Sequence, residues 1–102
     1  MNTVFVYGSL KNPMLRQMIV GREPIVKEDL LSDFIQVSHS LLPYPTVTKS
    51  KGFVRGVTFE VSDDELRKLD RYETKHYKKI EVILKSKVKA LCYVDSSDER
   101  FL

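Results

Sequence analysis

The sequence feature that most restricts the fold is a run of five β-branched and aromatic residues at positions 3–7, Thr-Val-Phe-Val-Tyr, which Gly8 and Ser9 end. Residues of this kind favour a strand. Successive side chains of a strand point to opposite faces, and here both faces are apolar, so the run predicts a strand buried on both sides. A chain of 102 residues fits one domain with a single core, and we expect residues 1–102 to form it.

Two short helices are indicated by residues that cap helix ends. Asn12 and Pro13 suit the N-cap and first position of a helix that Gly21 would end. Ser62 and Glu65 have the spacing of a capping box, in which each side chain accepts a hydrogen bond from the other residue's free backbone N–H. We expect the second helix to run to about residue 70 or 72.

Three further strands are predicted in the second half of the chain. Residues 52–61 suit one strand, with one apolar face formed by Phe53, Val57, Phe59 and Val61. Residues 77–84 and 88–95 suit two more, joined by the turn 85–87. The last should be half-exposed, with Cys92 on its apolar face and Tyr93 on the other. Connections this short favour antiparallel pairing. Strands with one or two short helices therefore predict an α+β fold.

The stretch 29–42 leaves two interpretations open. Phe34, Ile35 and Val37 suit a strand, whereas the apolar residues Leu30, Leu31 and Phe34 would also suit a helical turn. The segment 42–45 contains two prolines and must be extended or turning, because proline keeps the preceding residue out of the α region.

Composition restricts the classes of function. The net charge is only +3, whereas a nucleic-acid-binding surface requires concentrated basic charge, so we expect no nucleic-acid partner and read the lysines of 75–89 as a solvated face. Neither a basic leader nor an apolar run of 18 residues occurs, which predicts a cytoplasmic protein without a membrane segment. The lone cysteine, Cys92, can form no internal disulfide and shares its strand face with apolar residues, so it should pack in the core.

The first candidate site is the loop Tyr7-Gly8-Ser9-Leu10, which follows the first strand. A Gly-Ser pair at this place can direct consecutive backbone N–H groups toward one anion. The loop lacks the further glycines of a phosphate-binding loop, and an ordinary turn is the alternative interpretation.

The second candidate is Glu73. Leu66, Leu69 and Glu73 lie at i, i+3 and i+7 and share one helix face, so a helix that reached Glu73 would turn its carboxylate toward the core. A buried carboxylate is rare unless it is paired or functional. The alternative is that the helix frays near Asp70 and leaves Glu73 in a solvated loop.

Other chemistry finds little support in the residue pattern. His39 and His76 have no acidic or cysteine neighbour at ligand spacing, and we expect no metal site and no cofactor. We read His39 as a strand residue and His76 as a surface residue. Ser9 lacks the context of a serine hydrolase nucleophile.

Together these segments resemble the gamma-glutamylcyclotransferase-like family, small proteins that include the gamma-glutamylamine cyclotransferases. The resemblance covers nearly the whole chain, in order, and is carried by residues 4–11, 44–47, 54–61, 69–73 and 77–79. The first contains the Tyr-Gly-Ser-Leu loop, and the fourth reads Leu-Asp-Arg-Tyr-Glu. The resemblance implies a small mixed or antiparallel, barrel-like sheet with one or two short helices.

The resemblance also implies a reaction and its site. The α-amine of a γ-glutamyl amide attacks the γ-carbonyl of the same molecule, which releases 5-oxoproline and a free amine. Glu73 is implied as the catalytic acid/base. The substrate-binding loop is implied to be Tyr7, Gly8, Ser9 and Leu10. Tyr44 and Tyr77 are possible wall residues. The only partner implied is a small γ-glutamyl substrate, and the sequence does not specify an oligomeric state.

Two residues depart from the family pattern. Thr74 stands where the family often has glycine, and Lys79 stands where it has arginine. Lysine cannot reproduce the bidentate fork of arginine, so the substrate is the open question. A non-catalytic module that binds a small ligand or a protein on the same scaffold is the alternative interpretation. A small nucleic-acid-binding protein is a third.

Overall fold

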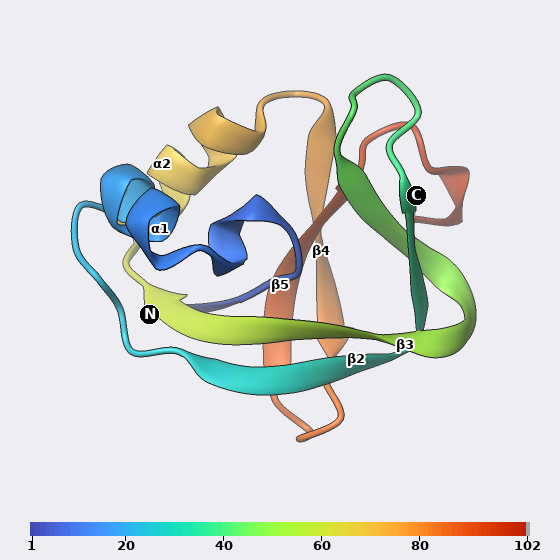
Figure 1. Ribbon diagram of the computed structural model, residues 1–102, viewed down its shortest axis with the longest axis horizontal. Helices are drawn as coiled ribbons and strands as arrows, with labels where there is room; N and C mark the ends of the chain where they lie inside the picture. Colours follow the sequence, from blue (N-terminus) through green and yellow to red (C-terminus); the bar gives the residue numbers. More distant parts are fainter. Residues whose placement is uncertain (102) are drawn as a thin grey trace.

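The computed structural model describes residues 1–101, which form one mixed five-stranded sheet, two α-helices and two short 3-10 helices (Figure 1). The elements follow in the order β1 (Asn2–Val6), a 3-10 helix (Ser9–Lys11), α1 (Pro13–Val20), β2 (Lys27–Ser38), β3 (Pro45–Val61), α2 (Asp63–Glu73), β4 (Tyr77–Ile83), β5 (Lys89–Asp95) and a 3-10 helix (Glu99–Phe101). The predicted α+β class is confirmed.

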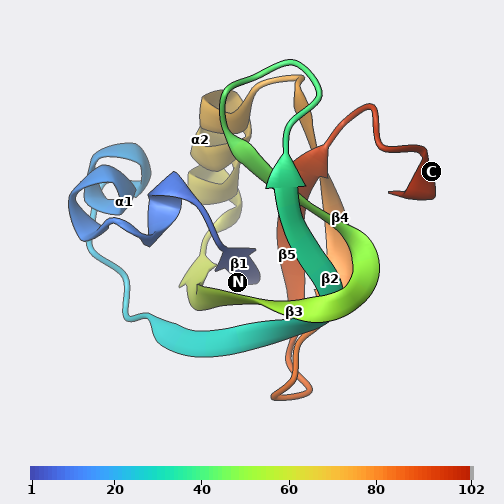
Figure 2. The same ribbon diagram turned by 45° about the vertical axis from the view of Figure 1, so that its right-hand side comes forward.

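The sheet has the strand order β2-β3-β1-β5-β4 and curls into a half-barrel (Figure 2). Neighbouring strands are antiparallel except β1 and β5, which run parallel with Val4 opposite Leu91. The expectation of antiparallel pairing is therefore correct for three of the four pairs. A parallel neighbour needs a long connection, and most of the chain lies between β1 and β5.

The prediction of a first strand buried on both sides is confirmed. Val4 and Val6 pack in a cluster with Phe59 and Leu69, on the face that the helices cover. Phe5 belongs to the second cluster, inside the curl of the sheet, and is fully buried. The end of β1 consequently lies between two packed layers.

Both helices begin at the predicted caps. The Asn12 side chain accepts a hydrogen bond from the N–H of Met14, and α1 ends at Gly21 with φ 93°. The capping box of Ser62 and Glu65 makes both of its hydrogen bonds. The second helix runs to Glu73, slightly beyond the predicted end, and the N–H of Thr74 closes its last turn by donating to the carbonyl of Asp70 (2.9 Å).

The ambiguous stretch 29–42 is mostly strand. It pairs as β2 with β3, which begins at Pro45, seven residues before the predicted start. Val47 is the only buried apolar side chain among the added residues, and 49–51 are polar and exposed, so no alternating apolar pattern marks the stretch. Its strand conformation depends on pairing with β2. Phe53 was expected on a core face but is 58% exposed. The helices pack against the other end of β3 (Figure 1). The cluster beneath them contains Phe59 and Val61 but not Phe53.

Gly56 lies where β3 crosses the end of β1. A Cβ atom at this position would lie 2.4 Å from the carbonyl oxygen of Val6 and 2.6 Å from the ring of Phe5. Replacing Gly56 by alanine should therefore lower the free energy of unfolding by about 1–3 kcal/mol, the usual cost of overpacking a core. Urea denaturation measures the loss, with the exposed Ser50→Ala as the control. A loss no larger than that of the control would contradict the packing described here.

Candidate functional site

A cavity of about 320 Å³ lies at the carboxyl end of β1, between the loop that follows it and the end of α2. Its walls include every residue that the sequence singled out as a site residue: Tyr7, Gly8, Ser9, Leu10 and Glu73. The two suggested wall residues, Tyr44 and Tyr77, also line it. Segments that are distant in the sequence thus meet around one cavity.

Glu73 is the last residue of α2 and faces this cavity. Leu69, one turn earlier on the same face, is fully buried, which fixes the orientation of the helix. Burial raises the pKa of the Glu73 carboxyl to about 7. Within residues 1–101 no hydrogen bond or ion pair uses this carboxylate. The alternative of a frayed, solvated Glu73 does not describe this structure.

The loop after β1 forms a short 3-10 helix, Ser9–Lys11, in which the N–H of Lys11 donates to the carbonyl of Gly8 (3.0 Å). The first N–H groups of a helix have no acceptor within it. In the part of the chain that the structure describes, the N–H groups of Ser9 and Leu10 have no hydrogen-bond acceptor. These donors are available beside the cavity, while the Ser9 hydroxyl pairs with the Tyr72 hydroxyl (2.9 Å).

The chain has five tyrosines, and all five line the cavity: Tyr7, Tyr44, Tyr72, Tyr77 and Tyr93. Besides Tyr72, which pairs with Ser9, three of them have hydroxyl groups that donate internal hydrogen bonds. Tyr7 donates to the carbonyl oxygen of Tyr93 (2.6 Å), Tyr77 to that of Pro45 (2.9 Å), and Tyr93 to Asp70 Oδ1 (2.6 Å). Desolvation on burial raises the pKa of Tyr77 to about 12, so its hydroxyl keeps its proton.

Tyr93 was expected on the exposed face of a half-exposed strand, and this was wrong. Strand β5 lies between β1 and β4, and both of its faces are packed at its carboxyl end. Tyr93 is only 5% exposed. Lys79, the residue that replaces arginine, forms an ion pair with the Asp70 carboxylate (2.9 Å). The same carboxylate accepts the hydrogen bond from the Tyr93 hydroxyl. It therefore supports the cavity wall from outside. Cys92 is fully buried, as predicted.

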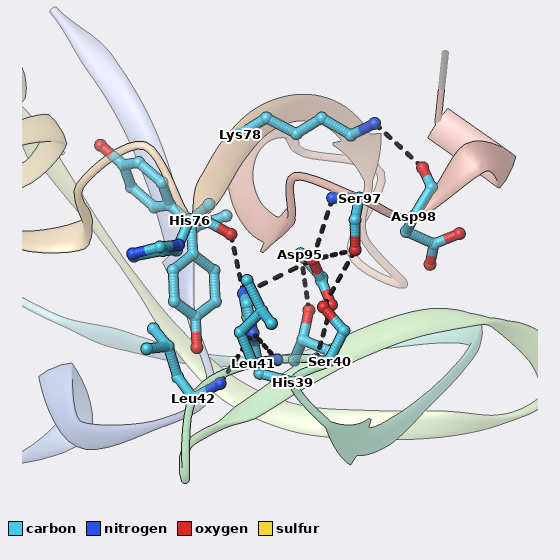
Figure 3. Close-up of polar contacts among 12 residues, drawn as sticks. His39, Ser40, Leu41, Leu42, His76, Lys78, Asp95, Ser97 and Asp98 are labelled. Atoms are coloured by element: carbon cyan, nitrogen blue, oxygen red, sulfur yellow. Dashed lines mark hydrogen bonds and ion pairs between the residues drawn. The ribbon is translucent and has the colours of Figure 1, made fainter.

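His39 holds two walls of the cavity together. It lies just after β2, and its Nε2 contacts the carbonyl oxygen of His76 (2.7 Å) while its Nδ1 accepts from the N–H groups of Leu41 (3.0 Å) and Leu42 (3.2 Å) (Figure 3). Since Nδ1 is the acceptor, the ring proton resides on Nε2. His39 was expected to be a strand residue but follows the end of β2, and no spacing pattern marks a contact made 37 residues away.

Asp95 orders the same region from the end of β5. Its carboxylate accepts hydrogen bonds from the backbone N–H groups of Ser40 (2.8 Å) and Ser97 (2.9 Å) (Figure 3). These bonds hold the pKa of the Asp95 carboxyl well below its usual value, against the opposing effect of desolvation. The segment that carries Leu42 and Tyr44 is thereby anchored beside the cavity.

Thr74, which follows Glu73, has φ 64° and ψ −173°, a conformation that glycine adopts readily and threonine rarely does. Thr74→Gly should therefore raise the free energy of unfolding by about 1 kcal/mol. Thr74→Ala should lower it, because alanine keeps the strain and loses the hydroxyl that accepts from the N–H of His76 (3.3 Å). Chemical denaturation of both variants tests this, and a glycine variant less stable than the alanine variant would contradict it.

No group of three or more His, Cys, Asp or Glu side chains in residues 1–101 is arranged to hold a metal ion. Nor is any helix in that part of the chain long and apolar enough to span a membrane.

Comparison with known proteins supports the resemblance seen in the sequence. A family model described as gamma-glutamyl cyclotransferase, AIG2-like, matches residues 4–100. AIG2-like protein D of Arabidopsis thaliana is 35% identical over 98% of this chain and 62% of its own length. Protein AIG2 C of the same plant is 32% identical, over 97% and 66%. The chain thus spans about half to two thirds of the length of such curated relatives.

Solved structures show the same fold. The solution structure of an Arabidopsis thaliana protein superposes with a TM-score of 0.84 at 30% identity, over 96% of this chain and 64% of that one. A structure described as gamma-glutamyl cyclotransferase superposes with a TM-score of 0.74 at 20% identity, over 92% and 66%. This second match supports the fold alone.

Proposed function

The chain belongs to the gamma-glutamyl cyclotransferase, AIG2-like family, and on this premise we propose that it cleaves γ-glutamyl amides to 5-oxoproline and a free amine. The observation that carries the proposal is the partly buried carboxylate of Glu73, which has no partner within residues 1–101 and lines one cavity with backbone N–H groups that have no acceptor there. The proposal includes action in the cytoplasm, where a lone cysteine stays reduced.

The reaction needs no nucleophile from the protein. The α-nitrogen of the substrate forms a bond to the γ-carbonyl carbon, and the bond from that carbon to the leaving nitrogen breaks. Because both reacting groups belong to one molecule, holding it in a folded conformation supplies much of the acceleration, with effective molarities that can reach ~10⁵ M or more. The cavity walls, fixed by the hydrogen bonds of Tyr7, Tyr77 and Tyr93, would impose that conformation.

Glu73 would transfer the protons. Its carboxylate accepts a proton from the substrate α-ammonium, which frees the lone pair that attacks, and returns a proton to the leaving nitrogen. The two protons that the α-nitrogen gives up are the two that the leaving amine gains, so Glu73 ends as it began. A carboxyl with a pKa near 7 suits both tasks, because it gives and takes a proton with similar ease.

The loop after β1 would bind negative charge. The N–H groups of Ser9 and Leu10 can donate to the substrate α-carboxylate or to the oxyanion that develops on the γ-carbonyl oxygen. Preorganised backbone donors need no rearrangement during the reaction. The loop and Glu73 would then act on opposite parts of the same five-membered transition state.

The proposal predicts the pH dependence of turnover. Glu73 must be ionised to accept the first proton, so kcat/KM should fall about tenfold per pH unit below pH 7 and level off above it. The raised pKa also means that the folded state binds the extra proton, so the stability from this group is full below pH 4.5 and is lost as pH rises through about 7. A pH–rate profile with no inflection between pH 5.5 and 8 would contradict the role of Glu73.

A panel of γ-glutamyl compounds tests the proposed function. The protein is incubated with γ-glutamyl amines, γ-glutamyl amino acids and glutathione, and 5-oxoproline is measured by chromatography. Release of 5-oxoproline from any of them, beyond a protein-free control, supports a cyclotransferase. Binding of these compounds without release would support a non-catalytic binding module instead.

A further inference from the structure

The mouth of the cavity is aromatic. Tyr44 and Tyr72 line it with exposed fractions of 59% and 36%, and Leu42 lies beside them. Deeper in the cavity, Tyr7 and Tyr93 are at most 7% exposed. The free space therefore runs from a buried end beside Tyr7 and Tyr93 to an open end lined by the rings of Tyr44 and Tyr72.

The lining of the cavity contains few charged side chains. Among its lining residues in the described part of the chain, Glu73 is the only Asp, Glu, Lys or Arg. If Glu73 gives its proton to the leaving nitrogen, a leaving amino acid would carry its α-carboxylate only two bonds from that nitrogen. That carboxylate would lie beside the Glu73 carboxyl with no lysine or arginine in the lining to neutralise it.

The substituent of the leaving amine would extend past Glu73 toward the mouth. An apolar ring that is half covered there should gain about threefold to tenfold in affinity, from half of the free energy of full burial. An ammonium group held at an exposed tyrosine face gains only about twofold to fivefold. The apolar substituent therefore fits this mouth better than a cationic one.

On the premise that the chain is a cyclotransferase, we propose that its substrates are γ-glutamyl amides of apolar, above all aromatic, amines that have no carboxylate next to the scissile nitrogen. Tyr44 and Tyr72 bind the substituent. The absence of a lining lysine or arginine selects against γ-glutamyl α-amino acids.

Four substrates that differ by one group each test this proposal: the γ-glutamyl amides of phenethylamine, ethylamine and 1,5-diaminopentane, and γ-glutamyl-L-phenylalanine. By 5-oxoproline release, kcat/KM for the phenethylamide should exceed that for the ethylamide at least about threefold, because the mouth covers part of the ring. It should exceed that for γ-glutamyl-L-phenylalanine by a similar factor or more, because the added carboxylate has no partner.

A matched pair of variants tests where the preference arises. Tyr44 and Phe53 are exposed to almost the same extent, 59% and 58%, but only Tyr44 lines the cavity. Tyr44→Ala should reduce the ratio of phenethylamide to ethylamide turnover several-fold. Phe53→Ala should leave that ratio unchanged. An equal loss of the ratio in both variants, or in neither, would overturn the assignment of the mouth.

The outcomes separate this inference from the proposed function. If 5-oxoproline is released but the ethylamide, the aminopentylamide or γ-glutamyl-L-phenylalanine is the better substrate, the inference is overturned and the cyclotransferase stands. If no compound is turned over, the proposed function fails, and calorimetry with the same four compounds still ranks their affinities. Preferred binding of the phenethylamide would then support the apolar mouth, and equal or absent binding would overturn it.

Discussion

Glu73→Gln should lower kcat for 5-oxoproline release by about 10²–10⁴-fold, the usual loss when a general acid/base is removed, and by more if both proton transfers fail. Glutamine has nearly the same shape but cannot take a proton. The substrate should still bind, since the backbone N–H groups of the loop are untouched. Single-turnover kinetics and calorimetry on the same preparation measure the two effects separately.

The control for this variant is Glu81→Gln, the same chemical change on β4. Glu81 is exposed, and its contact with Lys89 is long at 4.0 Å. It should keep normal turnover. Because an ionised, partly buried carboxylate destabilises the fold, Glu73→Gln should also be at least as stable as the parent above pH 7. A folded Glu73→Gln variant with near-normal turnover would remove Glu73 from the mechanism.

Acetylation of the substrate α-amine should abolish turnover. The acetyl group takes away the lone pair that attacks the γ-carbonyl, so no 5-membered lactam can form even if the molecule still binds. The measurement compares a γ-glutamyl amide with its N-acetyl derivative and follows release of the amine. An enzyme that uses water as nucleophile would cleave both and release N-acetylglutamate, which would contradict the proposed reaction.

The sequence predicted the two sides of the site because each depends on local chemistry. The apolar run before Gly8 specifies a buried strand, and the loop must follow where that strand ends. The capping box at Ser62 sets the start of α2, and the spacing of Leu66 and Leu69 then sets the direction of Glu73. Whether the helix would reach Glu73 was left open, since the fraying of a helix end depends on what packs against it.

The remaining features depend on contacts between distant segments. Tyr93 is buried because the cluster that contains Leu69 of α2 covers its face of β5, whereas strand alternation alone assigns it to an outer face. The contacts of His39 join two loops that no spacing pattern relates. Phe53 follows the alternation but lies beyond the reach of the helices. Local patterns thus predict elements, whereas the packing of both sheet faces decides these three positions.

In the proposed reaction the substrate's own amine, rather than water, is the nucleophile. Turnover of a γ-glutamyl amide in H₂¹⁸O, followed by mass spectrometry of the product, distinguishes the two nucleophiles. Cyclisation transfers no oxygen from water, so we expect 5-oxoproline without ¹⁸O. Glutamate that carries one ¹⁸O atom in its side-chain carboxylate would show hydrolysis and rule out cyclisation.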